Sequence, residues 1–147
     1  MAIATAPKLE IRTMIPPFEL PSADGESVNV WQFKQQKNLV LVFLPSMSCP
    51  GCAEFVEKMD ENCREYDEEL AAVLVIVRSD RDAIALRSPL AVLYDRDGRV
   101  TEQYASSAPA VFVADRFGEL QAEWQGRFPS QKEILDVVEL INLECPE

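Results

Sequence analysis

Two cysteines three positions apart are the residues of this sequence most able to do chemistry. Cys49 and Cys52 stand in the stretch FLPSMSCPGCAEF, with a proline and a glycine between them. Such a C-x-x-C pair can cycle between dithiol and disulfide, form half of a zinc site, or form a static disulfide. The chain has no histidine, and its other cysteines, Cys63 and Cys145, do not form a second C-x-x-C. A metal site is therefore disfavoured, and a redox-active pair is the preferred interpretation.

The residues between the two cysteines predict how the sulfurs differ. Pro50 suits the first position of a helix, since its missing N–H would have no partner there. Cys49 is then expected at or beside the N-cap and Cys52 in the first turn, where the positive end of the helix dipole favours thiolate over thiol. Cys52 shares the inward face of Phe55, whereas Cys49 falls outside that face. We therefore expect Cys49 to be the exposed attacking thiol and Cys52 its shielded partner.

Apolar patterns on both sides of the cysteines predict the elements that must position them. Residues 38–44 and 71–77 are continuous apolar runs, typical of strands covered on both faces. Between them, apolar residues at helical spacing predict one helix whose buried face is Phe55, Val56, Met59, Cys63, Tyr66 and Leu70. Strand, helix and strand in this order predict a right-handed, parallel βαβ unit.

The rest of the chain predicts shorter elements around this unit. Further strands are expected at 90–95, 109–115 and 120–124, a single helical turn within 31–38 and a weak helix at 81–88. A last helix should begin at a capping box formed by Ser130 and Glu133, with Ile134, Val137, Val138 and Ile141 on its apolar face.

Bulk composition limits the classes of partner. The 147 residues are 48% hydrophobic and 27% charged, which predicts one globular domain over residues 1–147, with residues 1–15 as a loose arm. A net charge of −11 argues against nucleic acid and an anionic membrane surface, because both require a basic patch. Residues 1–10 lack the pattern of a signal peptide, and no apolar run is long enough to span a membrane. We expect a cytoplasmic protein.

Several stretches resemble the peroxiredoxins of the alkyl hydroperoxide reductase and thiol-specific antioxidant family. PPFELPSADGESVNV is similar to that family's opening P-x-F-x-L-x-x-x-x-G-x-x-V, and VLYDRDGRVTEQYASSAPAVFVADRFGEL resembles its later stretch. FLPSMSCPGC is similar to the active-site line F-x-P-x-x-x-T-P-G-C, and the matching residues are Phe43, Pro45, Pro50, Gly51 and Cys52. The resemblance covers about residues 16–142. It implies a thioredoxin-like α/β fold, with a central mixed β-sheet flanked by helices and an N-terminal extended or hairpin extension.

Two departures from the peroxiredoxin pattern point toward thioredoxins. Cys49 stands where peroxiredoxins have a threonine, and Pro109 stands where they have an arginine. Pro109 resembles the cis-proline of thioredoxin-type oxidoreductases, which implies a cis Ala108–Pro109 bond with backbone turned toward the cysteines. The resemblance implies a substrate groove formed by Pro45, Pro50, Gly51, Ala108 and Pro109.

A third departure concerns the carboxylate that thioredoxins keep in the strand before the motif. Residues 39–44 are wholly apolar, so that group is missing. The nearest acids, Glu54 and Glu57, are expected to be solvated.

Three functions remain open on the sequence. The preferred one is a thiol–disulfide oxidoreductase in which Cys49 attacks a protein or small-molecule disulfide, Cys52 releases the product, and a thioredoxin- or glutathione-like thiol donor restores the dithiol. The first alternative is a thiol peroxidase, with Cys52 oxidised by a hydroperoxide and Cys49 resolving the product. The second is a non-enzymatic thioredoxin-fold module that binds partners or senses oxidation. None of these functions requires a cofactor. Cys63 and Cys145 fit either structural positions or a resolving role.

Overall fold

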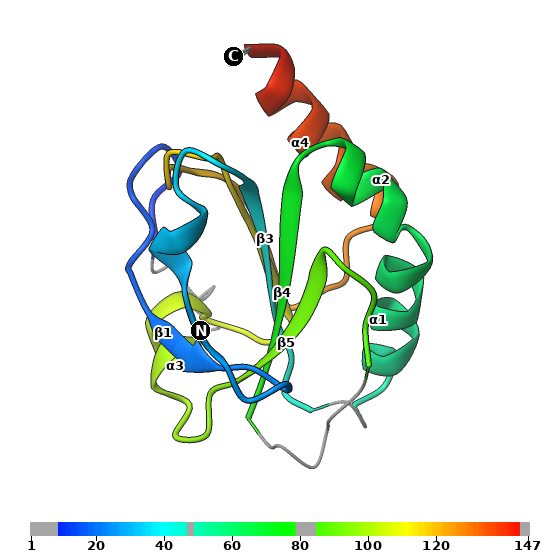
Figure 1. Cartoon of the computed structure of the whole chain (residues 1–147). Helices are drawn as coiled ribbons and strands as arrows, with labels where there is room; N and C mark the ends of the chain where they lie inside the picture. Colours follow the sequence, from blue (N-terminus) through cyan, green and yellow to red (C-terminus); the bar gives the residue numbers. More distant parts are fainter. Residues whose placement is uncertain (1–8, 47–48, 79–84, 145–147) are drawn as a thin grey trace, which may run out of the picture.

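The computed structural model describes residues 9–46, 49–78 and 85–144 of the chain. It holds a small hairpin, a larger sheet and helices on both sides of that sheet (Figure 1). In chain order the elements are β1 (Glu19–Pro21), β2 (Ser27–Asn29), the 3₁₀ turn η1 (Val30–Phe33), β3 (Asn38–Phe43), α1 (Cys52–Glu61), α2 (Cys63–Glu68), β4 (Ala71–Val77), β5 (Leu90–Tyr94), α3 (Arg99–Tyr104), β6 (Ala110–Ala114), β7 (Leu120–Gln125) and α4 (Gln131–Glu144).

The larger sheet is mixed and has the strand order β5-β4-β3-β6-β7. β3, β4 and β5 run parallel, whereas β6 and β7 are antiparallel to their neighbours. All residues of β3 and β4 are buried, as their continuous apolar runs predicted. The mixed sheet flanked by helices confirms the thioredoxin-like fold expected from the resemblance, and the pairing of β1 with β2 confirms the N-terminal hairpin.

The core divides between the two faces of this sheet. Alternate residues of β3 point to opposite faces, so Val40 and Val42 join one cluster while Leu41 and Phe43 join the other. The first cluster lies against α1, α2 and α4, and the second against the hairpin, η1 and α3 (Figure 1). The cysteine helix α1 is therefore packed on the same face as α4.

The long helix predicted after the cysteines is divided into two. α1 ends at Glu61, and α2 begins at Cys63. The side chain of Asn62 donates to the Lys58 carbonyl at 2.7 Å, so it supports the break by binding a backbone group at the end of α1. Leu70 adopts a positive φ of 58° and is 47% exposed, so its predicted place on the buried face was wrong. Phe55, Val56, Met59 and Tyr66 are buried as predicted, and Cys63 is half-buried.

Two further helix predictions need correction. Residues 85–88 are not helical, and the other half of the weak helix expected at 81–88 lies outside the described residues. Conversely, α3 was not predicted. It is capped by the buried carboxylate of Asp95, which accepts the Thr101 N–H at 2.7 Å and the Thr101 hydroxyl at 2.8 Å. Within the described ranges, no helix combines the length and apolarity that a membrane crossing needs.

Part of the predicted loose N-terminal arm is held against the sheet. Arg12 N–H donates to the Leu120 carbonyl at 2.7 Å, and Leu120 N–H donates to the Thr13 carbonyl at 2.9 Å. Ile15 is 1% exposed, because it belongs to the core cluster under the hairpin. The arm prediction was therefore wrong for residues 12–15, while residues 1–8 lie outside the described residues. The assignment of the whole chain to one domain stays a prediction.

Candidate active site

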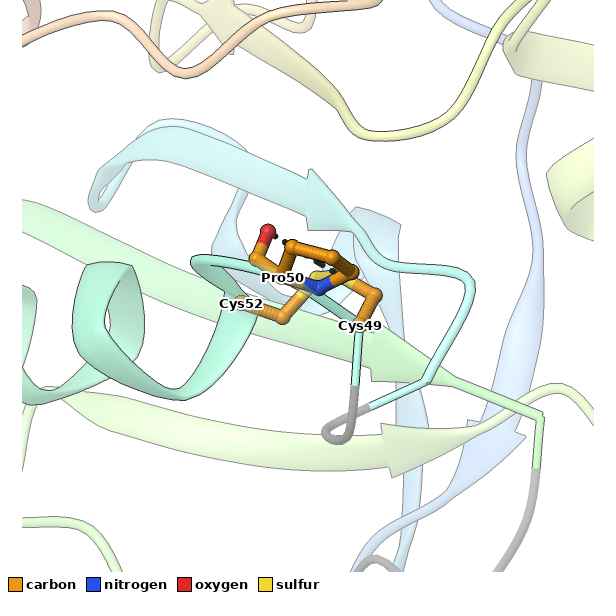
Figure 2. The surroundings of a disulfide bond; sticks show 3 residues. All are labelled: Cys49, Pro50 and Cys52. Carbon is orange, nitrogen blue, oxygen red and sulfur yellow. Dashed lines mark hydrogen bonds between the residues drawn. A yellow bond between two sulfur atoms is a disulfide. The ribbon is translucent and has the colours of Figure 1, made fainter.

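Cys49 and Cys52 are joined by a disulfide at the start of α1 (Figure 2). Their Cα atoms lie 5.3 Å apart, within the ordinary range for a disulfide. Cys52 is 0% exposed and belongs to the core cluster, whereas Cys49 is half-buried and packs against that cluster from outside. The pairing and the difference in exposure are as predicted. The catalytic roles of the two sulfurs stay predictions.

The helix begins later than Pro50 predicted. Gly51 is the N-cap, with a left-handed φ of 82° that residues with a Cβ rarely adopt. Cys52 is the first helical residue, and its N–H donates to the Cys49 carbonyl at 3.1 Å, which closes a tight turn. Cys49 therefore precedes the N-cap, and the placement at or beside it was wrong. The helix dipole acts more directly on Cys52, so the case for Cys49 as attacking thiol rests on its exposure.

The turn between the cysteines is open to solvent on its outer side. Pro50 and Gly51 are both exposed, and the Cys49 Sγ lies 3.8 Å from the Pro50 carbonyl oxygen (Figure 2). Pro45, at the start of the same loop, is also exposed. A large substrate can therefore approach Cys49 across this turn.

The Ala108–Pro109 bond is cis, as predicted. The pairing of Phe43 with Ala110 puts Pro109 beside the end of β3, where the chain leaves the sheet toward the cysteines. Ala108 is exposed, and within the described residues its backbone N–H and carbonyl have no hydrogen-bond partner. These groups can therefore pair with an extended substrate chain.

The segment before Pro109 is held by the end of β7. Gly126 N–H donates to the Pro109 carbonyl at 2.7 Å and to the Ser107 carbonyl at 3.1 Å. The Gln125 side-chain oxygen accepts the Ser106 N–H at 2.7 Å and the Ser107 N–H at 3.1 Å. The backbone offered by Ala108 is thus positioned by a strand at the edge of the sheet, a contact that sequence reasoning missed.

Phe128 is the second site residue that sequence reasoning missed. Its Cε2 atom lies 3.2 Å from the point that a Cβ on Gly51 would occupy, and its ring centroid lies 4.9 Å from that of Phe55. Beside it is a cleft of about 410 Å³ lined by Gly51, Glu54, Phe55, Lys58, Phe128, Pro129, Ser130, Gln131 and Glu133. The only sequence signal was an aromatic residue just before the capping box of the last helix.

The acidic residues closest to the cysteines in the sequence are solvated, and the buried carboxylates lie elsewhere in the sheet. Glu54 and Glu57 are exposed, as expected, and Glu54 pairs with Lys58 at 3.5 Å. Among the described residues, the buried carboxylates are Asp95 and Asp115, and both accept hydrogen bonds from nearby backbone N–H groups. Asp115 follows Ala114, which pairs with Leu39 at the start of β3, so Asp115 lies at the end of the sheet away from the cysteines.

The other cysteines are separate from the disulfide. Cys63 is a free, half-buried thiol in α2 that packs against the same core cluster, and Cys145 lies outside the described residues. No three Cys, Asp or Glu side chains in the described part of the chain are grouped so as to hold a metal ion.

Comparisons with known proteins find both peroxiredoxins and a thioredoxin, the two groups whose features the sequence combines. The sequence profile of the AhpC/TSA family matches residues 11–123. No sequence match was found among curated proteins.

Solved structures of two kinds share the fold. A 2-Cys peroxiredoxin of Plasmodium vivax has a TM-score of 0.76 at 17% identity, with 91% of this chain and 97% of that chain covered. The yeast mitochondrial 1-Cys peroxiredoxin has a TM-score of 0.77 at 14% identity, with 92% and 77% covered. The exposed lipoprotein thioredoxin of Streptococcus pneumoniae has a TM-score of 0.69 at 25% identity, with 85% and 99% covered.

Proposed function

The chain belongs to the AhpC/TSA family and is an oxidoreductase with a redox-active cysteine pair, and from that premise we propose that it reduces disulfide bonds. One observation carries the proposal: the two sulfurs are already joined, with Cys49 partly exposed and Cys52 fully buried. This arrangement suits a thiol that meets a large substrate and a second thiol that meets only the first.

The reaction consists of two thiol–disulfide exchanges. The Cys49 thiolate attacks one sulfur of the substrate disulfide and forms a mixed disulfide with it, while the substrate S–S bond breaks and the other substrate sulfur leaves as a thiolate. The Cys52 thiolate then attacks Cys49 Sγ, the mixed disulfide breaks, and the second substrate thiolate leaves. Both released thiolates take up protons from solvent. Two electrons have passed from the cysteine pair to the substrate, and the Cys49–Cys52 disulfide remains.

The substrate groove runs across the exposed turn. Pro45, Pro50 and Gly51 form its surface on the cysteine side. The backbone groups of Ala108, beside Pro109, have no partner among the described residues and pair with the substrate chain. A thioredoxin- or glutathione-like thiol donor then reopens the disulfide. We place the protein in the cytoplasm, where thiol donors of this kind keep most cysteines reduced.

Thiol peroxidase activity is the second candidate, because the family's active-site line aligns its reactive cysteine with Cys52. In that reaction the Cys52 thiolate attacks a hydroperoxide oxygen and the O–O bond breaks. A sulfenic acid forms on Cys52, and the other oxygen leaves and is protonated to an alcohol or water. Cys49 then condenses with the sulfenic acid and releases water. The burial of Cys52 and the replacement of the family's threonine and arginine by Cys49 and Pro109 favour disulfide reduction instead.

Single serine variants distinguish the two reactions. We expect Cys49→Ser to lower insulin disulfide reduction by more than about a hundredfold, since the attacking thiolate is lost. Cys52→Ser should accumulate a mixed disulfide on Cys49, visible by mass spectrometry, because no adjacent thiol remains to release the substrate. Cys63→Ser is the matched control and should behave as the wild type.

The opposite pattern would replace the proposal by peroxidase activity. A stable sulfenic acid on Cys52 in the Cys49→Ser protein, with peroxide reduced faster than insulin by the wild type, is the result that would do so.

A further inference from the structure

We infer that Phe128 is a specificity-determining residue, which keeps small oxidants away from Cys52 while leaving Cys49 open to disulfides. The inference rests on the proposed function in one respect: Cys52 attacks only the Cys49 sulfur and never the substrate. Its starting point is that Cys52 is 0% exposed although it opens a helix whose N-cap, Gly51, is exposed. The bonded Cys49 sulfur covers one side of Cys52, and the remaining sides must be covered by residues outside the turn.

The Phe128 ring lies over the residues that surround Cys52 in the chain. On one side it lies 3.2 Å from the point where a Gly51 Cβ would stand, and Phe128 atoms are the nearest three to that point. On the other side it packs on Phe55, which is one helical turn after Cys52, with ring centroids 4.9 Å apart. Phe128 and Cys49 both pack against the core cluster that contains Cys52. The ring thus closes the approach from the side of α4.

The neighbouring cleft reaches the Phe128 ring but not Cys52. Its volume of about 410 Å³ could admit hydrogen peroxide many times over. Gly51, Phe55 and Phe128 line it, but Cys52 is not among the described residues on its wall. Removal of the Phe128 ring would extend this cleft toward the Cys52 sulfur.

The loop that carries Phe128 is anchored at both ends. Gly126 is bound to the Ser107 and Pro109 carbonyls, as described above. At the other end, Ser130 N–H donates to a Glu133 carboxylate oxygen at 2.9 Å, and Glu133 N–H donates to the Ser130 hydroxyl at 3.0 Å. Phe128 is therefore held in place by the strand that positions the substrate groove and by the capping box of α4.

Alkylation of Cys52 tests the inference without reference to any enzymatic activity. In a reduced Cys49→Ser background, iodoacetamide labelling of Cys52 is followed by peptide mass mapping. We expect Phe128→Ala to raise the Cys52 labelling rate by about tenfold or more. A buried thiol reacts only when the structure around it opens locally, and the Phe128 ring makes that opening less frequent. Phe128→Leu should stay within about threefold of the parent, since it keeps most of the apolar cover. Phe117→Ala, which removes an exposed aromatic from the β6–β7 turn, should change nothing.

A second measurement tests selectivity in the protein with both cysteines. Phe128→Ala should raise hydrogen peroxide consumption by about tenfold while insulin reduction changes by less than about threefold. In the peroxide reaction the Cys52 thiolate takes one oxygen and hydroxide leaves, and Cys49 then forms the disulfide with loss of water.

Two results overturn the inference. In one, Cys52 of the parent is labelled as fast as a thiol in an unfolded chain. In the other, Phe128→Ala changes neither the Cys52 labelling rate nor the rate of hydrogen peroxide consumption. If Phe128→Ala does not fold by circular dichroism, Phe128→Val takes its place, with the same rise expected and the same refutation. If insulin is not reduced but Phe128 controls Cys52 labelling, only the proposed function fails.

Discussion

Reduction of the Cys49–Cys52 disulfide should destabilise the protein by an amount that follows from the size of the ring it closes. The two cysteines are separated by 3 positions, so the closed loop holds four residues. In the chain-entropy model, opening a loop of this size returns about 6 cal/mol/K to the unfolded chain, or about 2 kcal/mol at 25 °C. The oxidised protein should be the more stable form by this amount.

The same free energy can be expressed as a melting temperature. A chain of 147 residues has an unfolding entropy on the order of 300 cal/mol/K near its melting point. A difference of about 2 kcal/mol then lowers the melting temperature of the reduced protein by about 6 °C.

The sign of this shift also bears on the direction of electron flow. If the oxidised form is more stable by about 2 kcal/mol, the disulfide is harder to reduce in the folded protein than in the unfolded chain, by about 40 mV. The folded dithiol is then a better reductant than an unfolded one, as a disulfide reductase requires.

Thermal unfolding followed by circular dichroism, with and without excess phosphine reductant, measures the shift. The control is the double variant Cys49→Ser with Cys52→Ser, in which reductant should leave the melting temperature unchanged. A reduced wild type that melts at the same temperature as the oxidised protein, or higher, would refute the reasoning. A reduced form that is the more stable of the two would make the folded disulfide an oxidant of thiols.

Two further predictions concern the carboxylates that hold the fold. Asp95→Ala removes a buried cap of α3, and urea unfolding should show a loss of about 2–3 kcal/mol. Asp97→Ala is the comparison: this exposed carboxylate accepts the Arg99 N–H at 3.0 Å, so its loss should cost clearly less than that of Asp95. An equal loss at both positions would contradict the assignment. The backbone N–H of Arg87, followed by its guanidinium, holds the pKa of Asp60 below its ordinary value of 3.8. This stabilisation is present above the ordinary pKa and is lost as the pH falls through the lower folded pKa. The difference in free energy of unfolding between wild type and Asp60→Asn should therefore stay constant between about pH 5 and pH 7 and disappear below about pH 4. A gap that widens toward low pH would contradict the sign.

The sequence determined those features whose physical cause lies within a few residues of chain. The apolar runs at 38–44 and 71–77 had to be buried, because exposing them to water costs free energy wherever they lie. The capping box of Ser130 and Glu133 formed as predicted, since both partners belong to one helical turn. The pairing of Cys49 with Cys52 was predicted from their C-x-x-C spacing, and the cis Ala108–Pro109 bond was expected from the resemblance.

Tertiary structure decided what depends on residues far apart in the chain. Phe128 covers the cysteine turn although 75 or more positions separate it from Gly51 and Cys52. No local pattern reveals which aromatic residue a loop brings to a given helix, because that depends on how α1 and α4 share one face of the sheet. The hydrogen bonds of Gln125 and Gly126 to the segment around Pro109 likewise form only because β6 pairs with β7.

The start of α1 combines a feature predicted from the sequence with one that tertiary packing decided. Pro50 is compatible with the first helical position, and from the sequence Cys49 was expected at or beside the N-cap. The folded chain instead makes Gly51 the N-cap, in a left-handed conformation that its missing Cβ permits and with the Phe128 ring packed where a Cβ would stand. The identity of the reactive pair was therefore a property of the sequence. The greater exposure of Cys49 also followed from the sequence, because Cys52 shares the inward helical face of Phe55. The exact start of the helix, and the ring that packs beside Gly51, depend on contacts between distant segments.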